Sequence, residues 1–411
     1  MDFSLIRQIQ ILPFDTSCRE EKYLVCYKNR YFEVSTSLAE LICTLQCNDS
    51  LEKAAASFFQ KNGKIYSDEE FSAICEKFIS PIINNQNDVP HDKPRKNKTF
   101  IFQVGIIPPE IVKVVASHLQ FFMRPLVALV LLFFILACEM LFFFTSDLGG
   151  IHSLSGTNVY VIIGVLCLFV MGSLFHEMGH ATACRRFNAD NGGIGCGLYI
   201  SFPVLYTDVT NIWKLTRKQR IIVNVSGVYF QLIFLLPFFV IYFLTQHNIA
   251  RLFIYAINLN LLITLNPFFK FDGYWIMSDL VGVPNLRQRS MEYFVYLFKR
   301  VRRKEATKPF LHSIKPIERF FMIIYSLVVN IFFLYFFAYG MPLIIYNFIT
   351  VFPVNAKLIL DDISRGIWPE SSLIIGSVFQ IVFFWFILTF LYKMLIKLIK
   401  TAQSKKSTVQ A

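Results

Sequence analysis

The chain lacks the cysteine pattern of a disulfide framework. Of its nine cysteines, Cys138 and Cys167 lie inside apolar runs and five others are scattered through a polar N-terminal region. Cys43 and Cys47 are four residues apart on an expected helix, but no second pair completes a four-cysteine metal site. We therefore expect reduced thiols in a cytoplasmic compartment, acting as small buried hydrophobic side chains.

The chain also lacks the long apolar core of a cleavable signal peptide near its start, where it reads MDFSLIRQIQILPFD. Charged residues make up only 17% of the 411 residues, whereas 55% are hydrophobic and 45 are phenylalanine. A soluble domain of this size rarely carries so much apolar surface. The composition therefore predicts a polytopic membrane protein in contact with the lipid bilayer.

The formal net charge of +12 would suggest a nucleic-acid partner in a soluble chain. In a membrane protein the positive-inside rule explains it better, because Lys and Arg collect in cytoplasmic loops. The run KRVRRK, residues 299–304, could bind nucleic acid, but a juxtamembrane patch on anionic lipid is the better interpretation. We expect no nucleic-acid partner.

Six apolar segments are long enough to cross the bilayer, which takes about 20 helical residues. The fifth is overlong and contains Gly340 and Pro342, which predict a kink or tilt. The segments lie near 125–145, 158–180, 221–244, 252–270, 318–348 and 371–393.

Charge orients these segments. Loop 146–157 has no Lys or Arg, loops 181–220 and 276–317 are basic, and loop 350–370 is a modest outer segment of mixed charge. We therefore expect both termini in the cytoplasm of a bacterium, with the chain in the inner membrane. The second and fourth segments then both end at the inner interface.

The N-terminal region predicts a separate small domain. YLVCYKNRYFEVS alternates apolar and polar residues around a turn, which is typical of a β-hairpin. Three segments that each begin with a capping Ser, Thr or Asp follow, and predict short helices. We expect a mainly α fold: an α+β winged-helix-like cytoplasmic domain over 1–88, a linker over 89–118, a transmembrane helix bundle over 119–400 and a basic tail over 401–411.

SLFHEMGHATACRRF, residues 173–187, contains the H-E-x-x-H spacing at the end of the second apolar segment. His176 and His180 are four residues apart, so a helix projects both imidazoles from one face towards a single metal ion. Glu177 would take a proton from the attacking water, and Zn²⁺ would activate that water. Two interfacial histidines with an accidental Glu are the alternative, but ionisable groups at membrane depth are costly and need a reason.

A third ligand is expected from LNPFFKFDGYW, residues 265–275, which closes the fourth segment at the same depth. Asp272 in this stretch is then a sterically reasonable metal ligand. Read without the histidines, it would be an ordinary solvated loop residue.

On these two motifs the chain resembles the site-2 protease family of intramembrane zinc peptidases. The resemblance implies a zinc ion held by His176, His180 and Asp272, with Glu177 as general base. It covers the middle third of the chain well. Asn266 lies directly before Pro267, where much of the family has the Asn three residues before the Pro, and Phe271 replaces a usual Leu.

Three further residues are candidates for substrate positioning: Asn266, Asn224 and Gln231. Asn224 and Gln231, near SGVYFQ, either face the site or join helices by hydrogen bonds. Glu139, in the first apolar segment, either gates water or is a protonated residue near the outer interface. The stretch GGIGCGLYISFPVLYTDV, 192–209, is either a hairpin that offers an edge to an extended substrate or an amphipathic interfacial loop.

The leading hypothesis is an intramembrane zinc endopeptidase. The N-terminal domain resembles the precursor-recognition domains of enzymes that mature ribosomally made peptides, which implies a leader-bearing peptide substrate and export or peptide-modifying partner proteins. Regulated cleavage of a single-span membrane protein is the alternative. The second alternative is a non-hydrolytic export or immunity component that retains a relic metal site.

Overall fold

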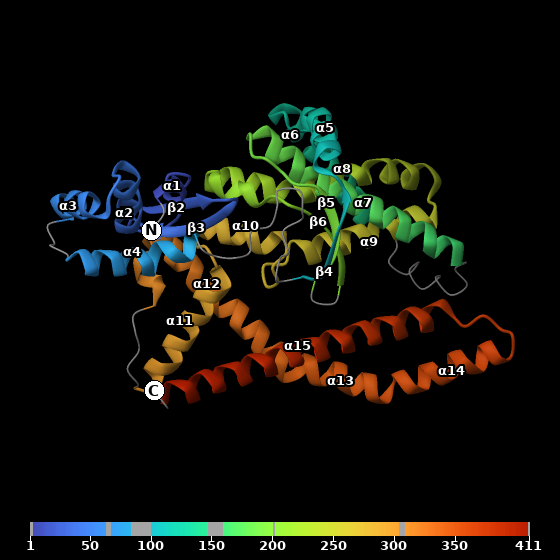
Figure 1. The fold of residues 1–411 in the computed structure, drawn as a ribbon. Coiled ribbons are helices and arrows are strands. Elements are labelled where there is room, and N and C mark those ends of the chain that lie inside the picture. Colours follow the sequence, from blue (N-terminus) through green and yellow to red (C-terminus); the bar gives the residue numbers. More distant parts are fainter. Residues whose placement is uncertain are drawn as a thin grey trace.

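The computed structural model of the chain describes residues 3–62, 67–83, 100–146, 159–199, 202–303 and 309–409. Most of them are helical, and the elements form a small N-terminal unit, a helix bundle and a long C-terminal helical hairpin (Figure 1). Five helical segments are long and apolar enough to cross a membrane. The mainly helical, polytopic fold expected from the sequence is confirmed.

The N-terminal unit joins a three-stranded sheet to helices. The predicted hairpin is present, and Lys28 and Asn29 in its turn have φ values of 47° and 60°, as a two-residue type I′ turn requires. The three predicted helices are also present, and the additional strand β1 pairs antiparallel with β2. The elements are α1 (Phe3–Ile6), β1 (Gln10–Phe14), β2 (Lys22–Tyr27), β3 (Arg30–Ser35), α2 (Thr36–Cys47), α3 (Leu51–Asn62) and α4 (Asp68–Ile83).

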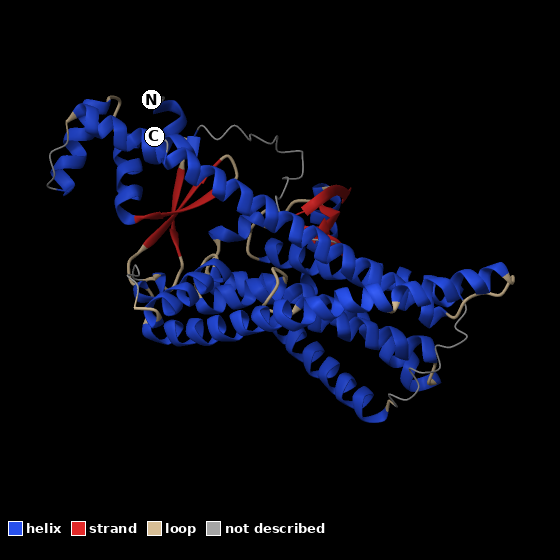
Figure 2. Cartoon of the chain, turned by 90° about the horizontal axis from the view of Figure 1, so that it is seen from below, coloured by secondary structure: helices blue, strands red, loops and turns tan. Residues whose placement is uncertain are grey.

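A second antiparallel sheet lies apart from the first (Figure 2). Its strands are β4 (Phe100–Ile107), β5 (Ile194–Tyr199) and β6 (Phe202–Thr207), in the order β4-β5-β6. Segment 192–209 therefore forms a hairpin rather than an irregular loop. Strand β4 and helix α5 (Pro109–Leu119) occupy part of the segment expected as a linker, whose residues 89–99 lie outside the described ranges.

The helix bundle is built around α8 (Arg217–Thr245), which packs on α6 (Pro125–Thr145), α7 (Val159–Arg186) and α9 (Asn248–Thr264). Short 3-10 turns, η1 (Gln120–Met123) and η3 (Thr210–Lys214), precede α6 and α8. The expected fourth span, 252–270, is a 17-residue helix that ends at Thr264. Asn266 precedes Pro267, and the residue before a proline is disfavoured in helical geometry, so the chain leaves the helix there.

The C-terminal part begins with α10 (Asp272–Val281), α11 (Leu286–Val301) and η4 (Phe310–Ser313). The overlong fifth segment is helix α12 (Pro316–Tyr335), a π-helical turn at Phe336–Gly340 and helix α13 (Met341–Thr350). This turn lies directly before Pro342, at the expected irregularity. Most of loop 350–370 is helix α14 (Phe352–Ser364) rather than a loop, and α15 (Ser371–Val409) packs against α13 and α14.

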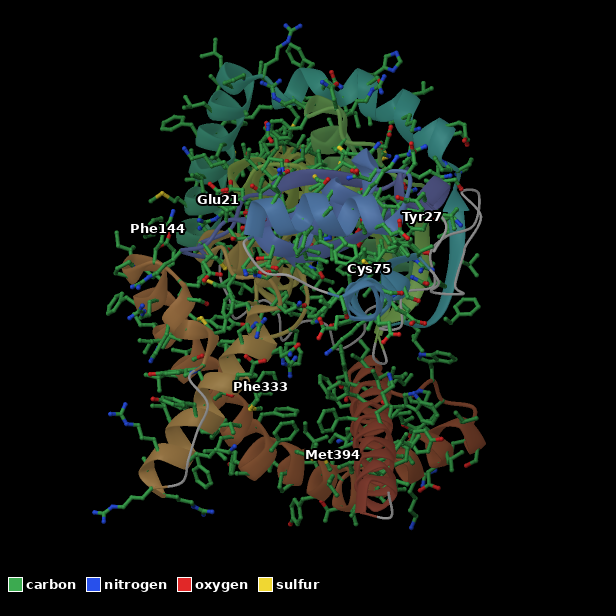
Figure 3. The ribbon with its side chains drawn as sticks, turned by 60° about the vertical axis from the view of Figure 1, so that its left-hand side comes forward. Glu21, Tyr27, Cys75, Phe144, Phe333 and Met394 are labelled. Atoms are coloured by element: carbon green, nitrogen blue, oxygen red, sulfur yellow. The ribbon has the colours of Figure 1, made fainter. Side chains whose placement is uncertain are left out.

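The helices that could span a membrane expose apolar side chains. On α6, Leu126, Phe133 and Phe144 are 74%, 76% and 83% exposed, and Figure 3 labels Phe144 at the edge of the molecule. Aqueous solvent would oppose such a surface, whereas hydrocarbon would not. Together with the five long apolar helices, this surface marks the chain as a membrane protein.

Candidate metal centre

Helix α7 brings the H-E-x-x-H residues together at its C-terminal end. His176 and His180 lie one turn apart, and their Nε2 atoms are 3.1 Å from each other. Both are buried, with 9% and 6% of their surface exposed, and Glu177 is 8% exposed. The helical spacing therefore does what the sequence predicts: it aims two imidazole nitrogens at one point.

Asp272 brings a third candidate ligand atom from another helix. It is the first residue of α10, and its Oδ2 atom lies 2.8 Å from His176 Nε2 and 3.2 Å from His180 Nε2. Zinc bonds of about 2.05 Å in tetrahedral geometry place ligand atoms about 3.3 Å apart. The three separations are close to this value, so the atoms already form a site of the right size for zinc.

The orientation of His180 also suits a metal ligand. Its Nδ1 donates a hydrogen bond of 2.8 Å to the carbonyl oxygen of Val223 on α8, so a neutral imidazole here has its lone pair on Nε2, the atom that would bind the ion. The Nδ1 atom of His176 is buried, and within the described ranges no protein group partners it.

Gly227 on α8 provides the space beside the two imidazoles. A Cβ atom at this position would lie 2.5 Å from His180 Nε2 and 2.6 Å from His176 Nε2. Any larger residue would therefore overlap the two imidazole nitrogens that face each other here. The glycine is required for space here, not for backbone conformation.

Asp272 is held in its ionised form. Burial raises the pKa of its carboxyl, but the neighbouring His180 charge and the hydrogen bonds from both imidazoles outweigh burial, so the pKa lies below its ordinary value. Its place in the first turn of α10 adds the favourable field of the helix N-terminus. A metal ligand has to be deprotonated, and this environment favours that form.

The loop between α9 and α10 is fixed by its own contacts. Asn266 accepts a hydrogen bond of 2.8 Å from the backbone N–H of Phe268, and Tyr325 donates one of 3.1 Å to the carbonyl oxygen of Pro267. The ring of Phe268 stacks on Phe332 with centroids 4.4 Å apart. Asn266 is therefore engaged in its own turn.

The other two positioning candidates lie on α8. Asn224 donates a hydrogen bond of 3.5 Å to Asp279 Oδ2 on α10. Gln231 is fully buried, one turn beyond Gly227, and neither polar atom of its side chain has a partner in the described part of the chain. Asn224 thus joins two helices, while Gln231 retains its hydrogen-bonding capacity.

The second sheet contacts residues on both sides of the candidate metal centre, next to the histidines and next to Asp272. Thr207 in β6 donates a hydrogen bond of 3.1 Å to the carbonyl oxygen of Glu177, and Tyr199 in β5 packs its ring 5.5 Å from that of Phe271. Neither residue lies in the two motifs that predict the centre. The run of apolar and β-forming residues FPVLYT, 202–207, is the signal that could identify the strand, but not its contacts.

The Glu139 side chain contacts a residue outside this centre. Its Oε2 atom accepts a hydrogen bond of 3.1 Å from Asn258, so the pair joins α6 to α9. Such bonds hold helices together within a membrane.

One comparison with known proteins gives a match to part of the chain. No protein-family model matches the chain, and no solved structure matches it. The chain is 26% identical over 145 residues to a protein of Bacillus subtilis (strain 168) whose provisional name is peptide zinc metalloprotease protein YydH. The match covers 34% of this chain and 56% of the relative, a little over half of that protein's length. Over about a third of its length, the chain is therefore similar to a protein named as a zinc metalloprotease.

Proposed function

We propose that the chain is an intramembrane zinc endopeptidase of the site-2 protease type. The observation that carries this proposal is the convergence of His176, His180 and Asp272 from two helices, with Gly227 leaving room between them. Zinc bound by these three side chains would polarise the scissile carbonyl and make water a stronger nucleophile. The name of the distant relative supports the same chemistry.

The remaining steps belong to side chains of the protein. Glu177 takes the proton of the attacking water and passes it to the leaving amine, as a general base and then a general acid. Its backbone is held by Thr207 of the second sheet. An extended substrate strand that pairs with an edge of this sheet would present its carbonyl groups, which a helical substrate hides.

The substrate we propose is a short leader-bearing precursor peptide. The N-terminal unit is a three-stranded sheet packed on helices, and β1 and β3 are the outer strands of its order β1-β2-β3. A leader that adds a strand there would bring the peptide to the membrane domain, with export or peptide-modifying proteins as further partners. Cleavage of a single-span membrane protein is the competing function.

A substrate-trapping experiment tests the proposal. Glu177→Ala keeps the three ligands but loses the base, so it should retain zinc and hold substrate uncut. The variant is purified in mild detergent from its own host, and co-purifying peptides are compared with those of the wild type by mass spectrometry. Enrichment of a short precursor supports peptide maturation, whereas enrichment of single-span proteins supports the competing function.

Metal analysis provides the control. Wild type should contain about one zinc per chain, and Asp272→Ala should contain markedly less, because a zinc site with two protein ligands is weak. Equal zinc in both proteins, or none in either, would rule out the three-ligand assignment and favour a non-hydrolytic membrane component.

A further inference from the structure

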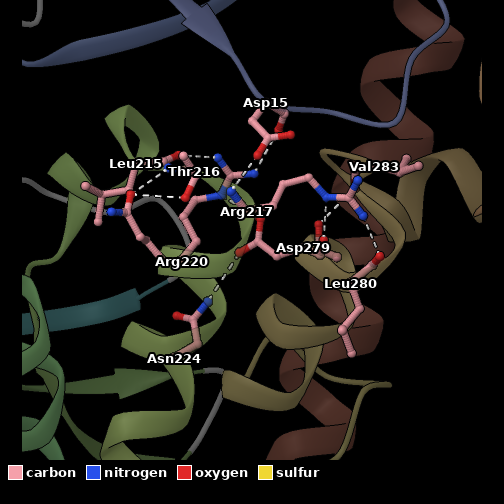
Figure 4. A network of polar contacts seen from close by, with 11 residues as sticks. Asp15, Leu215, Thr216, Arg217, Arg220, Asn224, Asp279, Leu280 and Val283 are labelled. Atoms are coloured by element: carbon pink, nitrogen blue, oxygen red, sulfur yellow. Dashed lines mark hydrogen bonds and ion pairs between the residues drawn. The ribbon is translucent and has the colours of Figure 1, made fainter. Parts of the chain in front are cut away.

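A buried ion pair joins the two helices that frame the metal centre (Figure 4). Arg220 of α8 donates a hydrogen bond of 2.6 Å from Nε to Asp279 Oδ1 on α10. Arg220 is 2% exposed and Asp279 is 6% exposed. Neither residue belongs to a sequence motif, and 59 positions separate them.

The two residues stand in a fixed relation to the metal ligands. Asp279 follows Asp272 by seven positions, two helical turns, and so lies on nearly the same face of α10. Arg220 likewise precedes Gly227 by seven positions on α8, and Gly227 lies against the two imidazoles. The helices therefore meet at two points about 10 Å apart: the metal centre and the ion pair.

The N-terminal unit completes the surroundings of Arg220. Asp15 accepts a hydrogen bond of 3.1 Å from Arg220 at its backbone oxygen and one of 2.9 Å from the N–H of Arg217 at its carboxylate. The guanidinium group lies 5.3 Å from the ring centroid of Phe14, the last residue of β1, and 5.7 Å from that of Trp213. Leu215 accepts a further bond of 2.9 Å from the same group.

The next residues of this segment continue the junction. Ser17 donates from its backbone N–H to Gly282 over 2.9 Å and from its hydroxyl to the carbonyl oxygen of Val281, both at the end of α10. Arg217 donates to the carbonyl oxygens of Asp279 and Leu280 over 2.9 and 2.6 Å. Ser17 and Arg217 thus both donate hydrogen bonds to the C-terminal end of α10.

We propose that Arg220 and Asp279 are positioning residues for Asp272, and that the N-terminal unit takes part in this role through Phe14 of β1 and Asp15, the residue after it. The pair fixes the position of α10 along the axis of α8. Because a short helix moves as a rigid rod, a shift at Asp279 is passed undiminished to Asp272. Metal–ligand distances tolerate only about 0.2 Å, so small shifts matter. This inference rests on the proposed zinc site.

Stability alone is a poor explanation for such a pair. Removing two charges from water costs several kcal/mol, and well-packed apolar residues often replace a buried pair without loss. What apolar residues do not supply is a directional bond that selects one register between two helices. The test therefore has to separate stability from register.

The double variant Arg220→Met/Asp279→Leu makes this separation, because it leaves no unpaired buried charge. We expect a melting temperature close to that of wild type, a zinc dissociation constant raised about tenfold or more, and an altered visible spectrum of the Co²⁺-substituted protein. Zinc affinity is measured by competition with a fluorescent chelator. Wild-type affinity and an unchanged Co²⁺ spectrum in a folded double variant would overturn the proposal.

Phe14→Ala tests the contribution of the N-terminal unit, with Phe78→Ala on α4 as the matched control because Phe78 is 46% exposed. Zinc affinity should fall in Phe14→Ala and stay unchanged in Phe78→Ala. Equal affinity in both variants would remove β1 from the proposal. Absence of zinc from the wild type would instead refute the proposed peptidase function, so the two failures are distinguishable.

Discussion

At the scale of single residues, the metal centre depends on an empty volume as much as on its ligands. The H-E-x-x-H spacing and the Asp-Gly pair predict His176, His180 and Asp272 as candidate ligands, and the structure brings their side chains together. Helical geometry accounts for the two histidines, because it fixes where side chains four positions apart point. Nothing in the sequence motif reveals that Gly227 faces the imidazoles. That relation follows from the packing of α7 on α8.

Gly227→Ala should abolish zinc binding. The new methyl group would lie within 2.6 Å of both Nε2 atoms, so the ion and the side chain compete for one space. We expect zinc affinity to fall by roughly 100-fold or more, beyond the usual effect of a residue that only orients a ligand. Gly164→Ala on α7 is the control, since a Cβ there has no neighbour within 4 Å in the described chain. Comparable zinc content in the two variants would contradict the prediction.

The thiols of the N-terminal unit should differ sharply in reactivity. Cys75 is buried, and burial raises the pKa of its thiol to about 11, whereas Cys43 and Cys47 are exposed. At pH 8 only about one Cys75 thiol in a thousand is a thiolate, which is the reactive form. Iodoacetamide at pH 8, followed by peptide mass spectrometry, should modify Cys43 and Cys47 and spare Cys75 until the protein is denatured. Rapid modification of Cys75 in the native protein would show that this face of α4 is not packed into the core of the N-terminal unit.

At the scale of elements, close helix contact holds the centre together. Gly179 on α7 lies one position before His180, and a Cβ there would fall on the backbone carbonyl of Ser226 and 2.9 Å from the Cβ of Phe230. The two helix backbones therefore approach each other where the ligands lie. Glycine at such a crossing permits an approach that any side chain would prevent.

Gly179→Ala should destabilise the bundle. Overpacking a close contact costs about 1–3 kcal/mol, more than the helix propensity gained by exchanging glycine for alanine. Thermal unfolding in detergent should show a lower melting temperature. Gly376→Ala on α15 has open space around its Cβ and should melt at or slightly above the wild-type temperature. A melting temperature of Gly179→Ala equal to that of Gly376→Ala would contradict the close packing of α7 on α8.

Elements with a local signal were predictable, and elements made by distant pairing were not. The β2–β3 hairpin and the long apolar helices are encoded by short-range periodicity. Strand β4 pairs with β5 about 90 residues further along the chain, and β1 contains Pro13, which weakens its strand signal. The Arg220–Asp279 pair also joins distant parts of the chain, so the sequence of either helix taken separately does not predict it.

At the scale of the whole molecule, both chain ends lie at the same end of the bundle in two perpendicular views (Figures 1 and 2). If the two ends share one side of a membrane, the number of crossings is even, and the five candidate spans together with α9 would give six. The N-terminal unit and the basic segments near residue 300 would then share one side of the membrane, as the positive-inside rule requires.

Reporter fusions test this topology. A cytoplasm-dependent reporter joined to either terminus should be active, and an export-dependent phosphatase at either terminus should be inactive. A phosphatase fused within 147–158 should show the opposite behaviour, because one expected crossing, α6, separates that segment from the N-terminal unit. Activity of the phosphatase at only one terminus would mean an odd number of crossings.

The length of α9 has a consequence for the surrounding lipid. Its 17 residues extend about 26 Å, less than the roughly 30 Å of hydrocarbon that neighbouring helices cross. Such a hydrophobic mismatch is relieved by local thinning of the bilayer, which draws headgroups and water towards the loop that ends at Asp272. The membrane would itself then hydrate the metal centre, and peptide hydrolysis should slow as the acyl chains of the host bilayer lengthen.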